Sequence, residues 1–268
     1  MEHIRTAMQK YGTNHGAWIV GADALGARPV RDTLWENLPL AGIDPVHLAA
    51  GRIVTVGRTD PALGAFDMMR TRILHQMQEN KWSSIAITSP KSGAGKSLLA
   101  LNLAFSLANL ENCRTVLMDL DLREPSIAAA LAILKPPAIE DYLRGRTARG
   151  QAFRRLRPNF AVAPNGKPVS LASELLQSPE TARVFREMKQ ALRPDIILCD
   201  LPPMLASDDL TAFLPNVDCV ILVVEAETDT LQEVDGCEHE LATRSNVLGV
   251  VLNKCRHRGE ATAYGNGN

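Results

Sequence analysis

The stretch that decides the fold reads Ile85-Ala86-Ile87-Thr88-Ser89-Pro90-Lys91-Ser92-Gly93-Ala94-Gly95-Lys96-Ser97-Leu98-Leu99. It begins with an apolar run typical of a buried strand, continues through a loop with two glycines and ends in an apolar-periodic helix. The two glycines allow the backbone to curl so that successive N–H groups point at phosphate oxygens, and the helix start adds its positive end. The stretch therefore predicts a loop that binds nucleotide phosphates.

The residues of this loop have separate expected roles. Lys96 is expected to place its ammonium group at the β- and γ-phosphates, and Ser97 to offer its hydroxyl to Mg²⁺. Pro90 stands where the usual pattern has its first glycine, so the alternative is an ordinary strand, turn and helix with a chance Gly-Lys-Ser. The residues expected to contact the nucleotide are Lys91, Ser92, Gly93, Ala94, Gly95, Lys96, Ser97 and Leu98.

Carboxylates follow two other apolar runs. Asp119 and Asp121 end the run that starts at Val116, and Asp200 ends the run Ile196–Asp200. Beside the loop, such carboxylates would hold Mg²⁺ or its waters, or take a proton from a nucleophile. The alternative is a set of acidic strand ends, which are common. We expect Ser97, Asp119 and Asp200 at the metal, and Lys96 with Asp119 and Asp121 as catalytic residues; which aspartate is the base stays open.

From Ser84 onward, short apolar runs alternate with helical patterns. Alternation of this kind predicts an α/β fold: an open, mostly parallel sheet with helices on both faces and its ligand at the carboxyl ends of the strands. The expected strands are Ser84–Thr88, Thr115–Asp119, Phe160–Ala163, Ile196–Asp200, Cys219–Glu225 and Leu248–Leu252, and the expected helices are Pro61–Asn80, Ser97–Leu110, Glu180–Leu192 and Thr228–Arg244.

Three regions differ in composition. Residues 1–60 contain scattered Gly and Pro and one plausible short helix, Glu2–Tyr11, so we expect a partly disordered N-terminal extension. Residues 61–258 form the expected nucleotide-binding domain. Residues 259–268 are small and polar and are expected to be a flexible tail.

Bulk properties exclude several classes of protein. The net charge is −1 and only 12 of the 268 residues are aromatic (six Phe, three Trp and three Tyr), so no nucleic-acid partner is expected. The five cysteines form no C-x-x-C pair, which favours a reducing compartment. No secretory signal or stretch long enough to span a bilayer is present, which predicts a cytoplasmic protein.

Two further features have open interpretations. Asn253 ends the last apolar run and is expected to bond an adenine edge, although a turn asparagine is nearly as good an explanation. The segment Leu143–Arg157 contains six arginines, which suit either an acidic or lipid partner or an ordinary solvated surface.

Together these motifs resemble the bacterial tyrosine kinases of capsule and exopolysaccharide synthesis. The likeness covers about Thr59 to Lys254. It includes the phosphate loop, the Asp-x-Asp-x-Arg motif within Val116–Arg123, and the Asp-x-Pro-Pro run after Asp200. It also includes Asp141-Tyr142-Leu143-Arg144-Gly145 and Ser173-Glu174-Leu175-Leu176.

The resemblance implies an ATP- and Mg²⁺-dependent tyrosine autokinase. It also implies activation by a membrane-embedded polysaccharide co-polymerase, here on a separate chain, which recruits the kinase to the inner face of the membrane. A homodimer or higher oligomer fits this picture. Two features depart from the family: only Tyr264 lies in the tail, where members carry a tyrosine cluster, and Gly64–Arg70 keeps only the last arginine of the ring-forming Glu-x-x-Arg-x-x-Arg.

Lys91 supports a second hypothesis. It lies five residues before Lys96, where the partitioning and division-site ATPases have a lysine that reaches phosphate across a dimer. The alternative function is therefore a dimerising ATPase switch without tyrosine kinase activity. A solvent-facing loop lysine is an equally good explanation of Lys91 itself.

Overall fold

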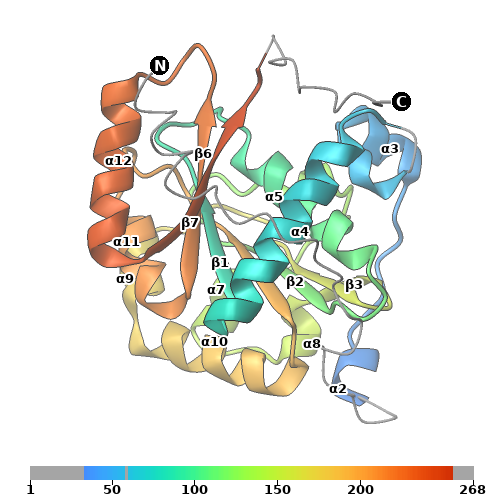
Figure 1. Ribbon diagram of the computed structural model, residues 1–268. Coiled ribbons are helices and arrows are strands. Elements are labelled where there is room, and N and C mark those ends of the chain that lie inside the picture. The colour runs from blue at the N-terminus through green and yellow to red at the C-terminus, as the bar shows by residue number, and fades with distance from the viewer. Residues whose placement is uncertain (1–32, 58–59, 256–268) are drawn as a thin grey trace, which may run out of the picture.

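The computed structural model describes residues 33–57 and 60–255 and contains a seven-stranded sheet between layers of helices (Figure 1). The strand order is β3-β4-β2-β5-β1-β6-β7. The α/β fold class is confirmed, because all neighbouring strands are parallel except β3 and β4. The strands are β1 Ser84–Thr88, β2 Thr115–Asp119, β3 Arg154–Arg157, β4 Phe160–Ala163, β5 Ile196–Asp200, β6 Cys219–Glu225 and β7 Asn246–Asn253.

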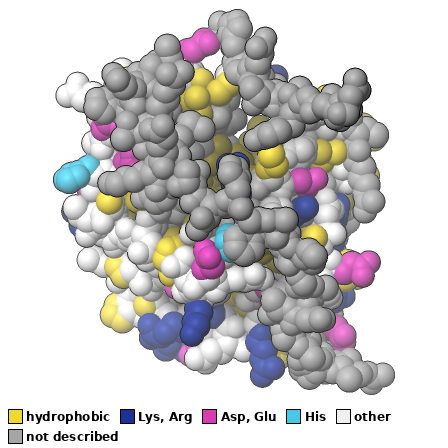
Figure 2. Space-filling model, in the orientation of Figure 1, with side chains coloured by type: hydrophobic (Ala, Val, Ile, Leu, Met, Phe, Trp, Pro, Cys, Tyr) yellow, Lys and Arg dark blue, Asp and Glu magenta, His cyan; other side chains and the backbone are white. Residues whose placement is uncertain are grey.

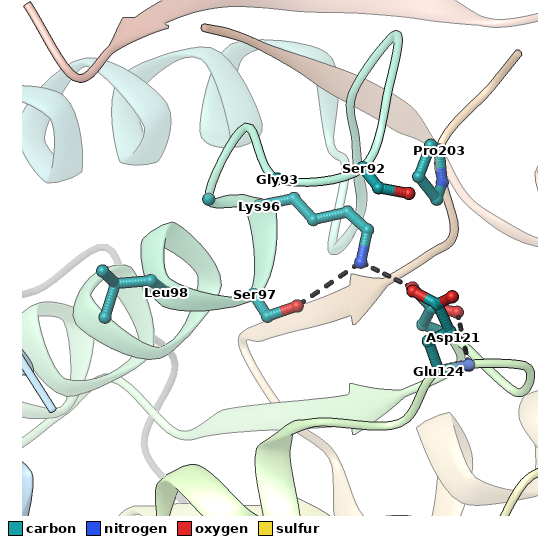
Figure 3. Close-up of a pocket in the computed structure, with 9 residues that line it drawn as sticks. Ser92, Gly93, Lys96, Ser97, Leu98, Asp121, Glu124 and Pro203 are labelled. Carbon is teal, nitrogen blue, oxygen red and sulfur yellow. Dashed lines mark hydrogen bonds and ion pairs between the residues drawn. The ribbon is translucent and has the colours of Figure 1, made fainter. Parts of the chain in front are cut away.

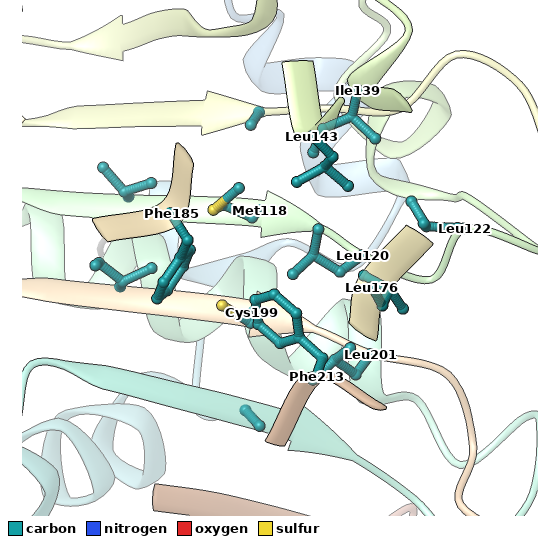
Figure 4. Packing of buried hydrophobic residues seen from close by; sticks show 14 of the residues in the cluster. Met118, Leu120, Leu122, Ile139, Leu143, Leu176, Phe185, Cys199, Leu201 and Phe213 are labelled. Atoms are coloured by element: carbon teal, nitrogen blue, oxygen red, sulfur yellow. The ribbon is translucent and has the colours of Figure 1, made fainter. Parts of the chain in front are cut away.

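The central strands are apolar on consecutive residues because both faces of the sheet are covered. Leu117 and Met118 are adjacent in β2, yet they pack into different hydrophobic clusters on opposite faces. Figure 4 shows the cluster that contains Met118, in which Met118, Cys199 and Phe185 lie close to Phe213. This two-sided burial holds the strands in a register that aligns their carboxyl ends.

The helices divide between these two faces. Helices α4 (Leu63–Asn80) and α5 (Lys96–Ala108) cover one face, while α7 (Ile139–Leu143), α9 (Ala172–Gln177), α10 (Pro179–Leu192), α11 (Asp209–Phe213) and α12 (Leu231–Arg244) contribute to the core of the other. The predicted long helices are each found within three residues of these bounds. The remaining helical segments are α2 Thr33–Glu36, α3 Pro45–Ala50, η2 Val54–Val56, α6 Ile127–Ala130, α8 Arg149–Ala152 and η3 Leu214–Asn216.

Local sequence signals explain where the two best-capped helices begin. In α10, the Ser178 side chain accepts a hydrogen bond from the Thr181 N–H, and Pro179 occupies the first turn. In α12, Thr230 and Glu233 form a reciprocal capping box. The second of these caps matters for the site, because Glu233 also faces the phosphate loop.

The N-terminal segment 33–57, which composition alone assigned to the extension, packs against the domain. The indole N–H of Trp35 donates to the Pro158 carbonyl at 2.7 Å, and a bridge joins Leu40 to Arg155 at the β3 edge. Asn102 of α5 accepts hydrogen bonds from the Val54 and Thr55 N–H groups. The folded unit thus includes residues before 61. The expected helix Glu2–Tyr11 and tail 259–268 lie outside the described residues.

Strand β3 was not predicted, because Arg154-Arg155-Leu156-Arg157 has none of the apolar run of a central strand. It is instead an antiparallel strand beside β4, so the arginine-rich segment spans helix and strand. Two of its arginines, for example, have partners within the chain: Arg144 pairs with Glu140, one helical turn away, and Arg157 donates to Asn109, 48 positions away. The segment therefore does not form one continuous helix face.

Charge on the visible face is unevenly distributed. Figure 2 shows the largest group of Lys and Arg side chains at the lower end of this face, away from the upper end to which β6 and β7 point in Figure 1. Among the described residues, no helix combines the length and the apolar character that crossing a membrane requires.

Candidate functional site

The phosphate loop connects β1 to α5 as the sequence predicts. Gly93 and Gly95 have φ values of 90° and 88°, a region that side chains with a Cβ rarely adopt. The backbone conformation therefore favours glycine at both positions, and a Cβ on Gly95 would lie 2.5 Å from the Asn253 Nδ2 and displace that side chain. Helix α5 begins at Lys96, which places its free N–H groups at the loop.

Lys96 is held among carboxylates at the end of the loop. Its Nζ lies 2.6 Å from the Asp121 Oδ2 (Figure 3). The same atom lies 3.9 Å from the Asp200 Oδ1. Burial disfavours the charged form, but Asp200 and Asp121 outweigh it and raise the pKa of Lys96. Lys96 is therefore a fixed cation, positioned by acidic groups from the end of β5 and from the segment after β2.

Asp119 and Asp200 are brought together by strand register. They are paired positions of β2 and β5, and both are fully buried. Asp119 accepts hydrogen bonds from the Ser126 and Ile127 N–H groups through Oδ2, while its Oδ1 and both oxygens of Asp200 have no hydrogen-bond partner. Burial and Asp200 raise the pKa of Asp119 well above its usual value, and burial raises the pKa of Asp200 to about 6.

These unsatisfied oxygens fit a divalent cation. Three carboxylates face one lysine, so the cluster lacks positive charge, and buried carboxylates require pairing or a metal. In the ranges 33–57 and 60–255, no group of three or more His, Cys, Asp or Glu side chains is arranged to hold a metal by itself. Mg²⁺ suits such a site, because it uses one or two carboxylates and takes its other ligands from water and phosphate.

A cleft of about 190 Å³ lies against the loop. Its walls include Asp121 but neither Asp119 nor Asp200, which lie behind it, and neither Lys91 nor Asn253 lines it. Glu124 and Pro203 also line the cleft, although neither was assigned a role from the sequence. Glu124 directly follows the Asp-x-Asp-x-Arg motif, and Pro203 is the last residue of the Asp-x-Pro-Pro run. The lining residues are Ser92, Gly93, Gly95, Lys96, Ser97, Leu98, Asp121, Glu124 and Pro203.

The loop after β5 is attached to the start of the phosphate loop. The Thr88 hydroxyl donates to the Pro202 carbonyl at 2.7 Å, and the Met204 N–H donates to the Ser89 carbonyl at 2.8 Å. Pro203, the last residue of the Asp-x-Pro-Pro run, therefore lines the cleft beside the backbone of the phosphate loop.

Lys91 lies outside the cleft and contacts α12. Its Nζ is 2.7 Å from the Glu233 carboxylate, and its side chain is 43% exposed. The hydrogen bond to Glu233 raises the pKa of Lys91, and the hydrogen bond from Lys91 lowers the pKa of Glu233 to about 2. Within one chain, Lys91 is thus directed at a helix and not at the phosphate site.

Asn253 contacts the phosphate loop itself. Its Nδ2 donates to the Ala94 carbonyl at 2.8 Å, which ties the end of β7 to the loop. Its expected bond to an adenine edge stays a prediction. This bracing contact could not be predicted from the sequence, because it joins residues 159 positions apart.

Comparisons with known proteins identify the family of this chain. Residues 85–265 match the CobQ/CobB/MinD/ParA nucleotide-binding domain. The chain is 30% identical over 194 residues to the tyrosine-protein kinase CpsD of Streptococcus agalactiae serotype III, covering 70% of this chain and 81% of CpsD. It is 27% identical over 219 residues to the tyrosine-protein kinase Wzc of Salmonella typhi, covering 80% of this chain but only 29% of Wzc.

Solved structures give the same result. The chimerical protein CapA2B2 aligns with a TM-score of 0.70 at 25% identity, over 81% of this chain and 95% of that chain. The kinase domain of the Escherichia coli tyrosine kinase ETK aligns with a TM-score of 0.67 at 25% identity, over 78% and 81%. MinD of Pyrococcus horikoshii shares the fold, with a TM-score of 0.53 at 21% identity over 63% and 69%.

The kinase relatives thus match more of the chain, at higher identity, than the division-site ATPase does. This chain belongs to the bacterial tyrosine-protein kinases of capsule and exopolysaccharide synthesis, within the CobQ/CobB/MinD/ParA nucleotide-binding family.

Proposed function

We propose that this chain binds ATP with Mg²⁺ and transfers the γ-phosphoryl group to a tyrosine hydroxyl, in a polysaccharide synthesis and export system. The observation that carries the proposal is the contact of Lys96 with Asp121 at 2.6 Å, beside a glycine loop and two unsatisfied buried carboxylates. Phosphoryl transfer depends on positioning and charge stabilisation, which this arrangement supplies.

The chemistry follows from the residues that line the cleft. The tyrosine oxygen attacks the γ-phosphorus, the bond to the ADP oxygen breaks, and the hydroxyl proton passes to a carboxylate. We assign the base to Asp121, because it lines the cleft, whereas Asp119 lies behind it with one oxygen bound to two backbone N–H groups. Lys96 and the loop N–H groups hold the phosphates.

The metal fits the remaining oxygen donors. Ser97, Asp119 and Asp200 would hold Mg²⁺ directly or through water, and the bound ion would neutralise charge on the phosphates. The contacts with Asp121 and Asp200 hold the Lys96 side chain at the cleft.

The acceptor tyrosine is proposed to lie outside the folded domain. Tyr142 is 3% exposed, and its hydroxyl donates to the Val184 carbonyl at 3.3 Å, so it cannot reach a neighbouring cleft. Tyr264 of the tail is the proposed site within this chain, with a tyrosine of another protein as the alternative acceptor.

The proposed partner is a membrane-embedded polysaccharide co-polymerase. It would recruit this protein to the inner face of the membrane and support a dimer or higher oligomer. The proposal rests on relatives such as Wzc, of which this chain covers 29%, and the succinoglycan biosynthesis transport protein ExoP of Rhizobium meliloti, of which it covers 22%.

The test is incubation with ATP and Mg²⁺, with and without the cytoplasmic part of such a co-polymerase, followed by mass spectrometry for phosphotyrosine. We expect phosphate on tyrosine in wild type and none in Lys96→Ala. ATP hydrolysis with no phosphotyrosine on the chain or on the partner would reject the kinase and favour the dimerising switch.

A further inference from the structure

Arg123 and Asp209 form an ion pair next to the cleft without lining it. The Arg123 Nε lies 2.7 Å from the Asp209 Oδ2, and its Nη2 lies 2.9 Å from the Asp209 Oδ1. The pairing is two-pronged, the geometry in which guanidinium and carboxylate bind most specifically. Asp209 has no exposed surface, whereas the Arg123 side chain is half-exposed.

The pair joins the two chain segments that carry the carboxylates of the site. Arg123 lies two residues after Asp121 and belongs to the same Asp-x-Asp-x-Arg motif. Asp209 is the first residue of α11, after the loop that runs from Asp200 through Pro203. The pair thus connects the segment that carries Asp121, on one wall of the cleft, to the loop that carries Pro203, on the other wall.

That loop is already attached on its opposite side. Its Met204 N–H donates to the Ser89 carbonyl at the start of the phosphate loop. The Leu120 N–H donates to the Asp200 carbonyl at 2.8 Å, which joins the start of that loop to the segment after β2. The Arg123–Asp209 pair adds a side-chain connection at the far end of the loop. With the contact of Lys96 and Asp121, the three segments around the cleft are linked in a ring.

Arg123 is not free to bind phosphate in this arrangement. Its hydrogen bond to Asp209 raises its pKa, and Asp208 and Glu174 add further negative charge nearby. Leaving Asp209 would strand a buried carboxylate without its partner, which is strongly unfavourable. The arginine of the Asp-x-Asp-x-Arg motif therefore has a different role from its two aspartates.

We propose that Arg123 is a positioning residue that holds, through Asp209, the far end of the loop that follows the metal residue Asp200, and so controls how tightly Mg²⁺ binds with the nucleotide. It touches neither phosphate nor metal. The inference rests on the proposed function, since it assumes that nucleotide binds with Mg²⁺ in this cleft. Partners of this kind typically tune metal affinity by holding the ligands in place.

The experiment compares Arg123→Lys, which keeps the charge but loses the two-pronged contact, with Asp209→Asn and the double variant. Arg183→Lys is the matched control, because Arg183 pairs with Glu180 and Glu187 on the outer surface of α10. For each protein, nucleotide affinity is measured in EDTA, the Mg²⁺ concentration for half-maximal tightening is titrated, and a thermal melt is recorded.

We expect affinity in EDTA to stay within about twofold of wild type, while the Mg²⁺ requirement rises about tenfold in both single variants, the usual size of such an effect. The Mg²⁺ requirement of the double variant should not exceed that of the more affected single variant. The requirement of Arg183→Lys should match that of wild type. If Asp209→Asn does not fold, Arg123→Lys carries the test.

Two results would overturn the inference. A lower melting temperature with an unchanged Mg²⁺ requirement would make the pair only structural. Weaker binding in EDTA with an unchanged Mg²⁺ requirement would make Arg123 a phosphate ligand. A wild-type protein that binds no nucleotide even with Mg²⁺ would instead refute the proposed function.

Discussion

The two ends of the phosphate loop each carry a lysine, and the two lysines lie in different surroundings. The Lys96 side chain is 12% exposed and its partner Asp121 is 4% exposed, whereas Lys91 and its partner Glu233 are 43% and 31% exposed. Both ion pairs have short contacts, so distance alone does not separate them. Burial does, because charges removed from water interact strongly and exposed pairs contribute little.

This difference teaches what each lysine is available for. If Lys96 moved away, its buried carboxylates would lose their positive partner, unless a ligand supplied another positive charge. Lys91 can exchange Glu233 for another anion at small cost, because water already screens the pair. One end of the loop is thus a fixed part of the site, and the other is free to respond to a second molecule.

Removing the fixed lysine should have the largest effect. We expect Lys96→Ala to weaken ATP binding about a hundredfold, since a charge-assisted hydrogen bond contributes up to about 3 kcal/mol. The fold should survive, because Lys96 lies at the cleft and not in the apolar core. Affinity measured beside a thermal melt tests this, with Lys91→Ala as the control, and unchanged affinity in a folded variant would refute the site.

The buried carboxylates predict a pH effect in the metal-free protein. The pKa of Asp200 is raised to about 6, so the folded state binds its proton more tightly than the unfolded state. The ionised Asp200 carboxylate therefore lowers the free energy of unfolding above pH 6. This loss of stability disappears as the pH falls below the pKa that Asp200 has in the unfolded chain. Asp200→Asn removes the cost.

We expect Asp200→Asn to raise the melting temperature in EDTA at pH 7.5, by about 2–4 °C for each kcal/mol relieved, and by less at pH 5. Stabilisation by Mg²⁺ with nucleotide should be lost in the same variant. Asp119→Asn should lose it too, and full Mg²⁺-dependent ATPase activity in both variants would mean that neither acid serves the metal.

The sequence predicted the short-range motifs and the strands that are buried on both faces of the sheet. Central strands such as β1 and β5 are apolar on consecutive residues, and the glycines with Lys96 mark the loop by spacing alone. Strand β3 escaped prediction because its stability comes from pairing with β4 and with the N-terminal segment, not from an apolar pattern.

Contacts between residues far apart in the sequence could not be predicted in the same way. The contact of Lys91 with Glu233 joins positions 142 apart, and only the topology brings them together. Glu124 could have been selected, since it extends the motif that ends at Arg123. The position of Asp121 in the cleft wall, with Asp119 behind it, depends on where β2 ends relative to β5, which no spacing reveals.

Breaking the exposed pair should have a smaller effect, visible only between molecules. We expect Lys91→Ala and Glu233→Gln to melt within about a degree of wild type, because exposed pairs contribute little and glutamine keeps the capping box. With a non-hydrolysable ATP analogue, wild type should associate in light scattering and Lys91→Ala should associate less. Glu233→Gln releases Lys91 and should associate at least as well as wild type.

A wild-type protein that stays monomeric at saturating nucleotide would leave Lys91 as a surface lysine. Equal association of wild type and Lys91→Ala would show that any dimer does not use this residue. Either result would remove the functional contrast between the two ends of the loop while keeping the structural one.

The smallest effect is expected at Asn253, which braces the middle of the loop through the Ala94 carbonyl. Losing one neutral hydrogen bond costs about 1 kcal/mol, so Asn253→Ala should weaken nucleotide binding about fivefold. Asn246→Ala is the matched control, because Asn246 donates to the Asp218 carbonyl at the other end of β7, far from the cleft. A comparison of ATP with GTP separates the brace from the predicted adenine contact. If Asn253 only braces the loop, both nucleotides weaken equally; if it also reads the base, ATP weakens more and the preference for ATP falls.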